Sequence, residues 1–148
     1  MRKLFVCDTN AIIWFFSDVF RTADKLSARA RRLMEEGCSE NGSDVRLSIP
    51  SVVFIEIFDK WCVDEVSVRR IHNEVFRRLS ESPNVEIRPI DLEVIACVAM
   101  IAGRLEDHEM HDKMVLASAI VLECPLITSD GEIAKYNNSE RVIPEVFT

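Results

Sequence analysis

The sequence predicts an α/β protein with a parallel β-sheet that carries helices on both faces. Short apolar segments of strand length recur along the chain, and stretches with the helical spacing of apolar residues separate them. Parallel strands need long crossover connections, which helices usually provide, so this alternation favours a parallel sheet. No repeat, low-complexity tract or linker rich in proline and glycine divides the chain. We therefore expect one domain over residues 1–148.

The strands are predicted from brief apolar runs bounded by polar or turn-forming residues. Four of these runs have the length and composition of buried strands, and a fifth, near the C-terminus, is a candidate edge strand. They cover residues 3–7, 46–49, 85–88, 125–128 and 141–143.

The helices are predicted from apolar spacing and from capping residues. The first helix should begin near Thr9 or Asn10, Gly37 is a plausible end of the second, and Asp91 should cap a later helix whose apolar stripe extends to Ala102. After the first, helices are expected over about 26–37, 50–62, 68–79, 91–102, 112–123 and 131–135.

Composition and charge limit the classes of function. The chain has 48% hydrophobic and 29% charged residues, an ordinary balance for a globular domain, and lacks any apolar run long enough for a membrane span. Its N-terminus does not resemble a signal peptide, because polar residues interrupt it early. The net charge of −7 argues against bulk attraction to nucleic acid or anionic membranes. Five scattered cysteines without a Cys-x-x-Cys pair do not indicate zinc and fit a reducing cytoplasm.

Four carboxylates occupy positions that are unfavourable for folding. Asp8 ends the first apolar run, Glu56 interrupts an apolar helix, Asp112 opens another, and Asp130 closes the run at 125–128. An ionised carboxylate is costly to remove from water unless it is paired or binds a metal. Four such positions in one small domain suggest that the charges meet around a cation.

The positions of the acids relative to the predicted strands support this convergence. Ligands of open parallel sheets bind beyond the carboxyl ends of the strands, and Asp8 and Asp130 directly follow strands. Asp112 begins the helix that precedes the strand at 125–128, which Asp130 closes. Glu56 lies about a turn and a half into its helix and could reach back over the same edge.

A cluster of carboxylates without cysteine or histidine at matching positions favours Mg²⁺ or Mn²⁺ over Zn²⁺. Such a cation can lower the pKa of a bound water and neutralise a phosphodiester in its transition state. The sequence therefore indicates metal-dependent hydrolysis of phosphodiesters.

Each acid also has a purely structural interpretation. Asp8 and Asp112 could be helix caps, Asp130 could form a turn with the following glycine, and Glu56 could lie on a solvated helix stripe. Nearby charged groups are interpreted in the same way: Asp107 and Glu109 as solvated loop charges, and Arg70 and Arg77 as a solvated face paired with Glu74 and Glu81. His108 and His111 could be ligands or a general base, but a position at the surface or helix start is the favoured interpretation.

The motifs resemble those of the PIN domain family, in particular the VapC-type toxin ribonucleases, over nearly the whole chain. The blocks around Asp112 and Asp130 are the most specific at their spacing, and the first block alone is weak. The matching blocks are Val6-Cys7-Asp8-Thr9-Asn10, Ile49-Pro50-Ser51 with Glu56, His111-Asp112-Lys113 with Ala117-Ser118-Ala119, and Pro125-Leu126-Ile127-Thr128-Ser129-Asp130.

The resemblance implies a three-layer fold with a five-stranded parallel sheet in the order 3-2-1-4-5 and helices on both faces. It implies that Asp8, Glu56, Asp112 and Asp130 are catalytic, metal-binding acids for Mg²⁺ or Mn²⁺. Thr9 and Thr128 match hydroxyl positions that support these acids. The implied activity is endonucleolytic cleavage of RNA, and the implied partners are an RNA substrate, a small antitoxin protein and a second copy of the chain in a homodimer.

Other functions remain open at this point. The chain could be an RNA-processing nuclease outside a toxin–antitoxin system, or an inactive PIN fold used for binding, although retention of all four acids argues against the latter. A phosphotransferase of the haloacid dehalogenase type would want an aspartate where Asn10 stands. A receiver-type phosphoacceptor would want a nucleophile after the third strand, where Arg88-Pro89 is found instead.

Overall fold

The structure, a computed structural model, describes residues 3–101 and 103–148. Ala102, which the apolar pattern assigned to a helix stripe, lies outside the described residues. The first part of the chain forms β1 (Lys3–Cys7), α1 (Thr9–Phe15), α2 (Ser17–Phe20), α3 (Ala28–Gly37), β2 (Val45–Pro50), α4 (Ser51–Lys60), α5 (Glu65–Ile71), the π-helical segment η1 (His72–Phe76) and α6 (Arg77–Glu81). The second part forms β3 (Val85–Arg88), α7 (Leu92–Ile101), α8 (Met110–Leu122), β4 (Leu126–Ile127), α9 (Gly131–Glu140) and β5 (Val146–Phe147).

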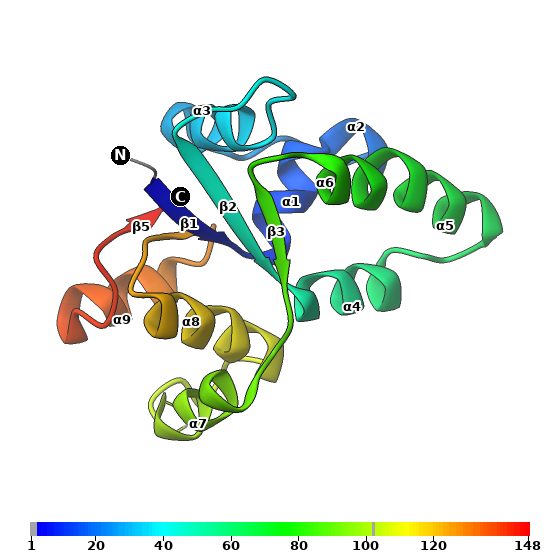
Figure 1. Ribbon diagram of the computed structural model, residues 1–148. Coiled ribbons are helices and arrows are strands. Elements are labelled where there is room, and N and C mark those ends of the chain that lie inside the picture. The colour runs from blue at the N-terminus through cyan, green and yellow to red at the C-terminus, as the bar shows by residue number, and fades with distance from the viewer. Residues whose placement is uncertain (1–2, 102) are drawn as a thin grey trace.

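The five strands form one sheet in the order β3-β2-β1-β4-β5, and all neighbouring strands are parallel. In Figure 1, α8 with α7 beneath it lies on one side of the sheet, and α3 and α6 lie on the other. The helix α8 contacts β1 and β2, whereas α3 contacts β2 and α6 contacts β3. The predicted α/β class, strand order and two helical layers are confirmed.

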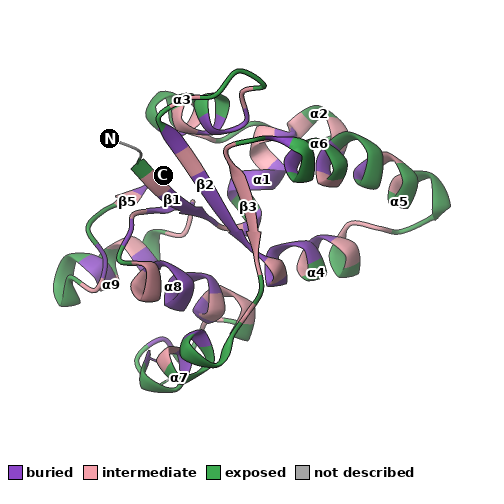
Figure 2. Ribbon diagram, in the orientation of Figure 1, coloured by how far each residue is buried: buried purple, intermediate pink, exposed green. Residues whose placement is uncertain are grey.

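The core lies along the middle strands and the helix faces that cover them (Figure 2). Val6, Leu47 and Ile127 are fully buried on β1, β2 and β4, as expected for strands covered on both faces. Gly37, at the end of α3, approaches β2 so closely that an added Cβ atom would lie 2.4 Å from Cγ of Leu47. The glycine therefore fits a close helix–strand contact that a larger residue would disrupt.

The strand order reverses beside β1, because β2 and β3 lie on one side of it and β4 and β5 on the other. In doubly wound sheets, ligands bind beyond the carboxyl ends of the strands at such a switch point, which here lies between β1 and β4. Asp8 directly follows β1, and Asp130 lies just after β4. The topology thus brings the first and last of the four acids to one edge.

The C-terminal elements differ from the sequence-based expectation. The edge strand predicted at 141–143 is wrong, since the fifth strand is Val146–Phe147. The helix expected to end near residue 135 continues to Glu140 as α9, because Ile133 and Asn137, one turn apart, both face the interior. The side-chain oxygen of Asn137 then accepts a hydrogen bond from the backbone N–H of Ile143 at 3.0 Å, which holds the segment as a loop.

Two further details of the helices differ. The helix α8 begins at Met110 rather than Asp112, because the carbonyl of Glu109 accepts the N–H groups of Asp112 and Lys113. The helix predicted over 68–79 forms as α5, η1 and α6. Its apolar residues Ile71, Val75 and Leu79 are buried, but Val68 is exposed. Within the described part of the chain, no helix has both the length and the apolar character needed to cross a bilayer.

Candidate metal centre

Asp8 is the acid at the centre of the sheet edge, and its carboxylate has two hydrogen-bond donors. It is the N-cap of α1, where it accepts the N–H of Ala11 at 2.8 Å, and the hydroxyl of Thr128 donates to its other oxygen. Burial nevertheless raises the pKa of Asp8 to about 7, with a smaller contribution from repulsion by Asp112 and Asp130. The capping interpretation is therefore correct, and the same carboxylate is also held in an environment that disfavours its charge.

Glu56 turns inward from α4, although its helix exposes an apolar neighbour. Its side chain is 13% exposed, whereas Ile55 is 66% exposed. The hydroxyl of Thr9 donates to Oε2 of Glu56 at 2.8 Å, and Nζ of Lys60 lies 3.6 Å from Oε1. A place on the solvated stripe of the helix, the alternative that the sequence left open, is therefore wrong for Glu56.

Asp112 lies in the first turn of α8 and is not its N-cap. Burial raises the pKa of its carboxyl, and repulsion by Glu56 and Asp130 acts in the same direction, while His111 and His108 oppose it. Nε2 of His111 lies 3.4 Å from Oδ1 of Asp112 and 2.6 Å from Oε2 of Glu56. The imidazole of His111 thus bridges carboxylates from two different helices.

Asp130 caps α9 and also faces the other acids. Its Oδ1 accepts the N–H groups of Glu132 at 2.9 Å and Ile133 at 3.4 Å, and its own N–H donates to the hydroxyl of Thr128 at 3.1 Å. Nε2 of His108 lies 2.8 Å from its Oδ2. Thr128 therefore joins the carboxylate of Asp8 to the backbone of Asp130.

The two histidines were considered from the sequence as ligands or a general base, but a position at the surface or at a helix start was favoured. Their side chains are only 11% exposed for His108 and 18% for His111, so a surface position is wrong, whereas His111 does lie at the start of α8. Their place on either side of the third acid in the sequence was the available signal. It could not identify the partners, which are Glu56 on α4 and Asp130 before α9.

The neighbouring charges separate into those that join the cluster and those that do not. Lys60 bridges Glu56 and Glu109, with Nζ 3.0 Å from Oε2 of Glu109, and this contact lowers the pKa of Glu109. Asp107 is exposed, as its interpretation as a loop charge predicted. The predicted pairs of the solvated face are present as well, from Arg70 to Glu74 and Arg77 to Glu81.

Whether the four acids can bind a metal ion depends on the contacts that their carboxylates already make. In the described ranges no three His, Cys, Asp or Glu side chains form a ready cage for a metal ion. Some carboxylate oxygens already have partners, since Glu56 faces Thr9 and His111 while Asp130 faces His108. The oxygen ligands of the four acids suit a hard divalent cation such as Mg²⁺. Such a cation would also relieve the repulsion among the acids.

Comparisons with known proteins agree with the fold. The family model described as PIN domain matches residues 5–138. Similar solved structures include VapBC2 from Rickettsia felis bound to a DNA fragment from its promoter, with TM-score 0.68, 15% identity and coverage of 98% of this chain and 99% of that chain. A toxin–antitoxin complex from Klebsiella pneumoniae has a TM-score of 0.58 and 20% identity, with coverage of 99% of this chain and 96% of that chain. FitAcB from Neisseria gonorrhoeae has a TM-score of 0.61 and 16% identity, with coverage of 97% of this chain and 96% of that chain.

The identities to these structures are low, so their likeness concerns the fold. No curated protein sequence matches the chain. PIN domains are generally nucleases and generally depend on divalent metals. The family model covers most of the chain, including all four acids, and the chain belongs to the PIN domain family.

Proposed function

We propose that the protein is a Mg²⁺- or Mn²⁺-dependent endoribonuclease whose catalytic acids are Asp8, Glu56, Asp112 and Asp130, within one PIN-like domain over residues 1–148. The observation that carries the proposal is the electrostatic coupling of these acids. Asp8 is repelled by Asp112 and Asp130, and Asp112 by Glu56 and Asp130, so Asp112 links Glu56 to the two acids at the sheet edge. Membership of a family of nucleases gives independent support.

The four carboxylates would hold the cation, and hydroxyl groups would orient two of them. Thr128 fixes one oxygen of Asp8, and Thr9 fixes one oxygen of Glu56. Groups that orient metal-binding carboxylates commonly affect metal affinity strongly. Two of the residues assigned to metal binding thus have a fixed orientation before the cation arrives.

When bound, the cation would lower the pKa of a water molecule and neutralise charge on the phosphodiester. The basic side chains that contact the acids among the described residues are Lys60, His108 and His111. Lys60 lies at the margin, where it could meet the RNA backbone beside the reacting phosphate.

We also propose that the nuclease is the toxin of a toxin–antitoxin pair. The structures compared above include VapBC2 and a structure described as a toxin–antitoxin complex. A small antitoxin encoded beside this chain would then be its partner. An RNA-processing role outside such a pair is the alternative, and a short reading frame directly upstream would favour the toxin.

A homodimer is proposed from the surface of α7. Its sequence is apolar except for Glu93, yet Leu92 is 79% exposed, Ile95 51% and Met100 81%. A helix that is apolar nearly all round is usually buried. A second copy of the chain offers the same nearly uncharged face, so pairing two such faces would bury these side chains without placing many like charges together.

The proposed activity is tested by cleavage of a single-stranded RNA in Mg²⁺ or Mn²⁺, compared with EDTA. We expect cleavage with either metal and none with EDTA. Asp8→Asn should lower the rate at least about 100-fold, since it removes a charge from the proposed metal site. Asp107→Asn, a loop acid of the same type, is the matched control and should keep its rate. Equal rates for wild type and Asp8→Asn would contradict the assignment.

A further inference from the structure

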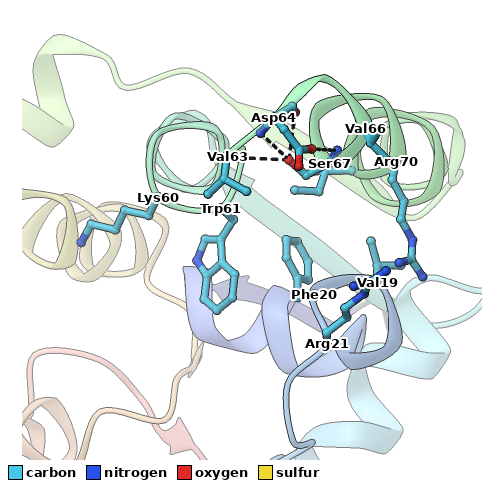
Figure 3. A pocket seen from close by; sticks show the side chains of 11 residues that line it. Val19, Phe20, Arg21, Lys60, Trp61, Val63, Asp64, Val66, Ser67 and Arg70 are labelled. Atoms are coloured by element: carbon cyan, nitrogen blue, oxygen red, sulfur yellow. Dashed lines mark hydrogen bonds between the residues drawn. The ribbon is translucent and has the colours of Figure 1, made fainter.

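A pocket of about 330 Å³ lies beside the carboxylate cluster, between the end of α2, the end of α4 and the start of α5. Its volume is at the lower end of the range of small-ligand sites, roughly 300–1,000 Å³. Phe20, Trp61 and Val63 line its apolar part, and Arg21, Lys60 and Arg70 supply positive charge (Figure 3). None of these residues is one of the four acids of the proposed metal centre, although Lys60 contacts Glu56.

The apolar part of the pocket is built from two aromatic rings. Phe20 and Trp61 meet edge to face, with ring centroids 5.5 Å apart and planes at 73°. Phe20 is 7% exposed, whereas Trp61 is only half-buried, so the indole retains accessible surface next to a fixed ring. Val63 at the rim is 82% exposed. An accessible indole on a rigid support suits a flat, aromatic ligand.

The charges of the pocket favour an anion. Figure 3 shows Arg21 and Arg70 on one side of the pocket and Lys60 on the other. Arg70 is held by Glu74 at 2.8 Å and by the carbonyl of Asp18 at 3.3 Å. Among the described residues Arg21 forms no ion pair within 4 Å, and its side chain is exposed at the end of α2.

Among the described residues that line the pocket, the one acid is Asp64, and its carboxylate already accepts a hydrogen bond. Oδ1 of Asp64 accepts the N–H of Ser67 at 2.7 Å and caps α5. Hydrogen bonds from Ser67, and to a smaller extent the charge of Arg21, lower the pKa of Asp64. Lys60 is already paired with Glu56 and Glu109, and Arg70 with Glu74, so Arg21 supplies the local positive charge that the pocket offers to a ligand. Such local charge complements a polyanion.

Lys60 connects the pocket to the carboxylates. It lines the pocket, and its Nζ lies 3.6 Å from Oε1 of Glu56. We propose that the pocket binds one nucleotide of the RNA substrate, with the base against Trp61 and a phosphate at Arg21. The proposal rests on the endoribonuclease function proposed above. Accessible aromatic rings next to basic side chains are the features with which proteins bind single-stranded RNA.

Fluorescence of Trp61 gives a direct test that does not depend on cleavage. The chain has two tryptophans, so Trp14→Phe leaves Trp61 as the only one, and Asp8→Asn keeps the RNA intact in Mg²⁺. Titration of this double variant with a mixed-sequence, single-stranded RNA of twelve nucleotides should quench Trp61 emission to saturation. Trp61→Leu should weaken binding of the labelled RNA by about 5- to 150-fold, the effect of losing one stacked base.

Substitution of Arg21 tests the phosphate contact. Arg21→Gln should reduce the slope of log affinity against log salt by about 0.7, the value for one phosphate contact with a single strand. Arg141→Gln is a matched control, because Arg141 is also an exposed arginine that ends a helix in the left-handed region, with φ of 52° against 55° for Arg21. It follows α9, away from the pocket, and should leave the slope unchanged.

The outcomes separate this proposal from the proposed function. If wild-type protein cleaves RNA but bound RNA neither quenches Trp61 nor responds to Arg21→Gln, the nucleotide pocket is refuted while the nuclease stands. A protein segment would then be the better occupant of the pocket. If RNA is neither cleaved nor bound, both proposals fail. Thermal melting of each variant shows whether Trp61→Leu acts through folding, and the quenching result stands without that variant.

Discussion

Replacement of Asp8 by asparagine should reverse its effect on stability between acid and neutral pH. Burial raises the pKa of Asp8 from 3.8 to about 7, so the folded protein favours the protonated carboxyl. The folded pKa lies above the unfolded value, and the favourable contribution is therefore fully present below about pH 4 and lost as the pH rises to about 7. Asparagine mimics the neutral carboxyl and does not titrate.

The magnitude follows from the shift of roughly three pH units. At about 1.4 kcal/mol per unit, ionised Asp8 costs the metal-free fold about 4 kcal/mol. Asparagine avoids this cost, but it has one oxygen for two donors, Ala11 and Thr128, and so forfeits about 1 kcal/mol. We expect Asp8→Asn to be about 3 kcal/mol more stable than wild type at pH 8 in EDTA, and about 1 kcal/mol less stable at pH 4.

The assay is urea unfolding of both proteins in EDTA between pH 4 and pH 8. Thermal melting should give the same sign, with a difference of about 6–12 °C at pH 8 for a chain of this length. Added Mg²⁺ at about 100 times its dissociation constant should stabilise the wild type by about 2.7 kcal/mol and the variant much less. A difference between the two proteins that stays constant across this pH range would refute the reasoning.

Three other substitutions test separate parts of the structure. Gly37→Ala should destabilise the fold by about 1–3 kcal/mol in urea unfolding, because its Cβ atom would overlap a side chain of β2, whereas Gly42→Ala, with nothing within 4 Å, should not. Thr9→Val should weaken Mn²⁺ binding about 10- to 100-fold in calorimetry, because it removes the hydroxyl that donates to Glu56. Thr22→Val is the control and should leave the affinity unchanged, because the buried hydroxyl of Thr22 has no hydrogen-bond partner among the described residues. Met100→Glu should convert a dimer to a monomer in sedimentation experiments, and a monomeric wild type would refute the α7 interface.

Much of the fold could be predicted because the strand pattern and the long connections agree. Strands such as residues 3–7 and 85–88 are set by local sequence, and their ranges in the structure match. The fifth strand could not be placed by the same rule. Its segment contains few residues, and its position depends on Asn137, which holds Ile143 in a loop through a tertiary hydrogen bond. A local pattern carries no information about such a bond.

The candidate site shows the same division between local and tertiary information. The positions of Asp8 and Asp130 follow from strands that end at one sheet edge. Glu56 was distinguished by its apolar neighbours, although the structure exposes Ile55 and turns the glutamate inward. The partners of His108 and His111 could not be predicted, because they come from distant segments that only the folded chain brings together.

Calorimetric titration with Mn²⁺ tests the convergence of the four acids most directly. The comparison should include Asp8→Asn, Glu56→Gln, Asp112→Asn and Asp130→Asn, with Asp107→Asn as an exposed control. If the four carboxylates share a metal site, each of the four substitutions should weaken Mn²⁺ binding at least about tenfold, and the control should bind like wild type. Wild-type affinity in any of the four variants would contradict a shared site, and absence of binding to wild type would contradict the metal centre altogether.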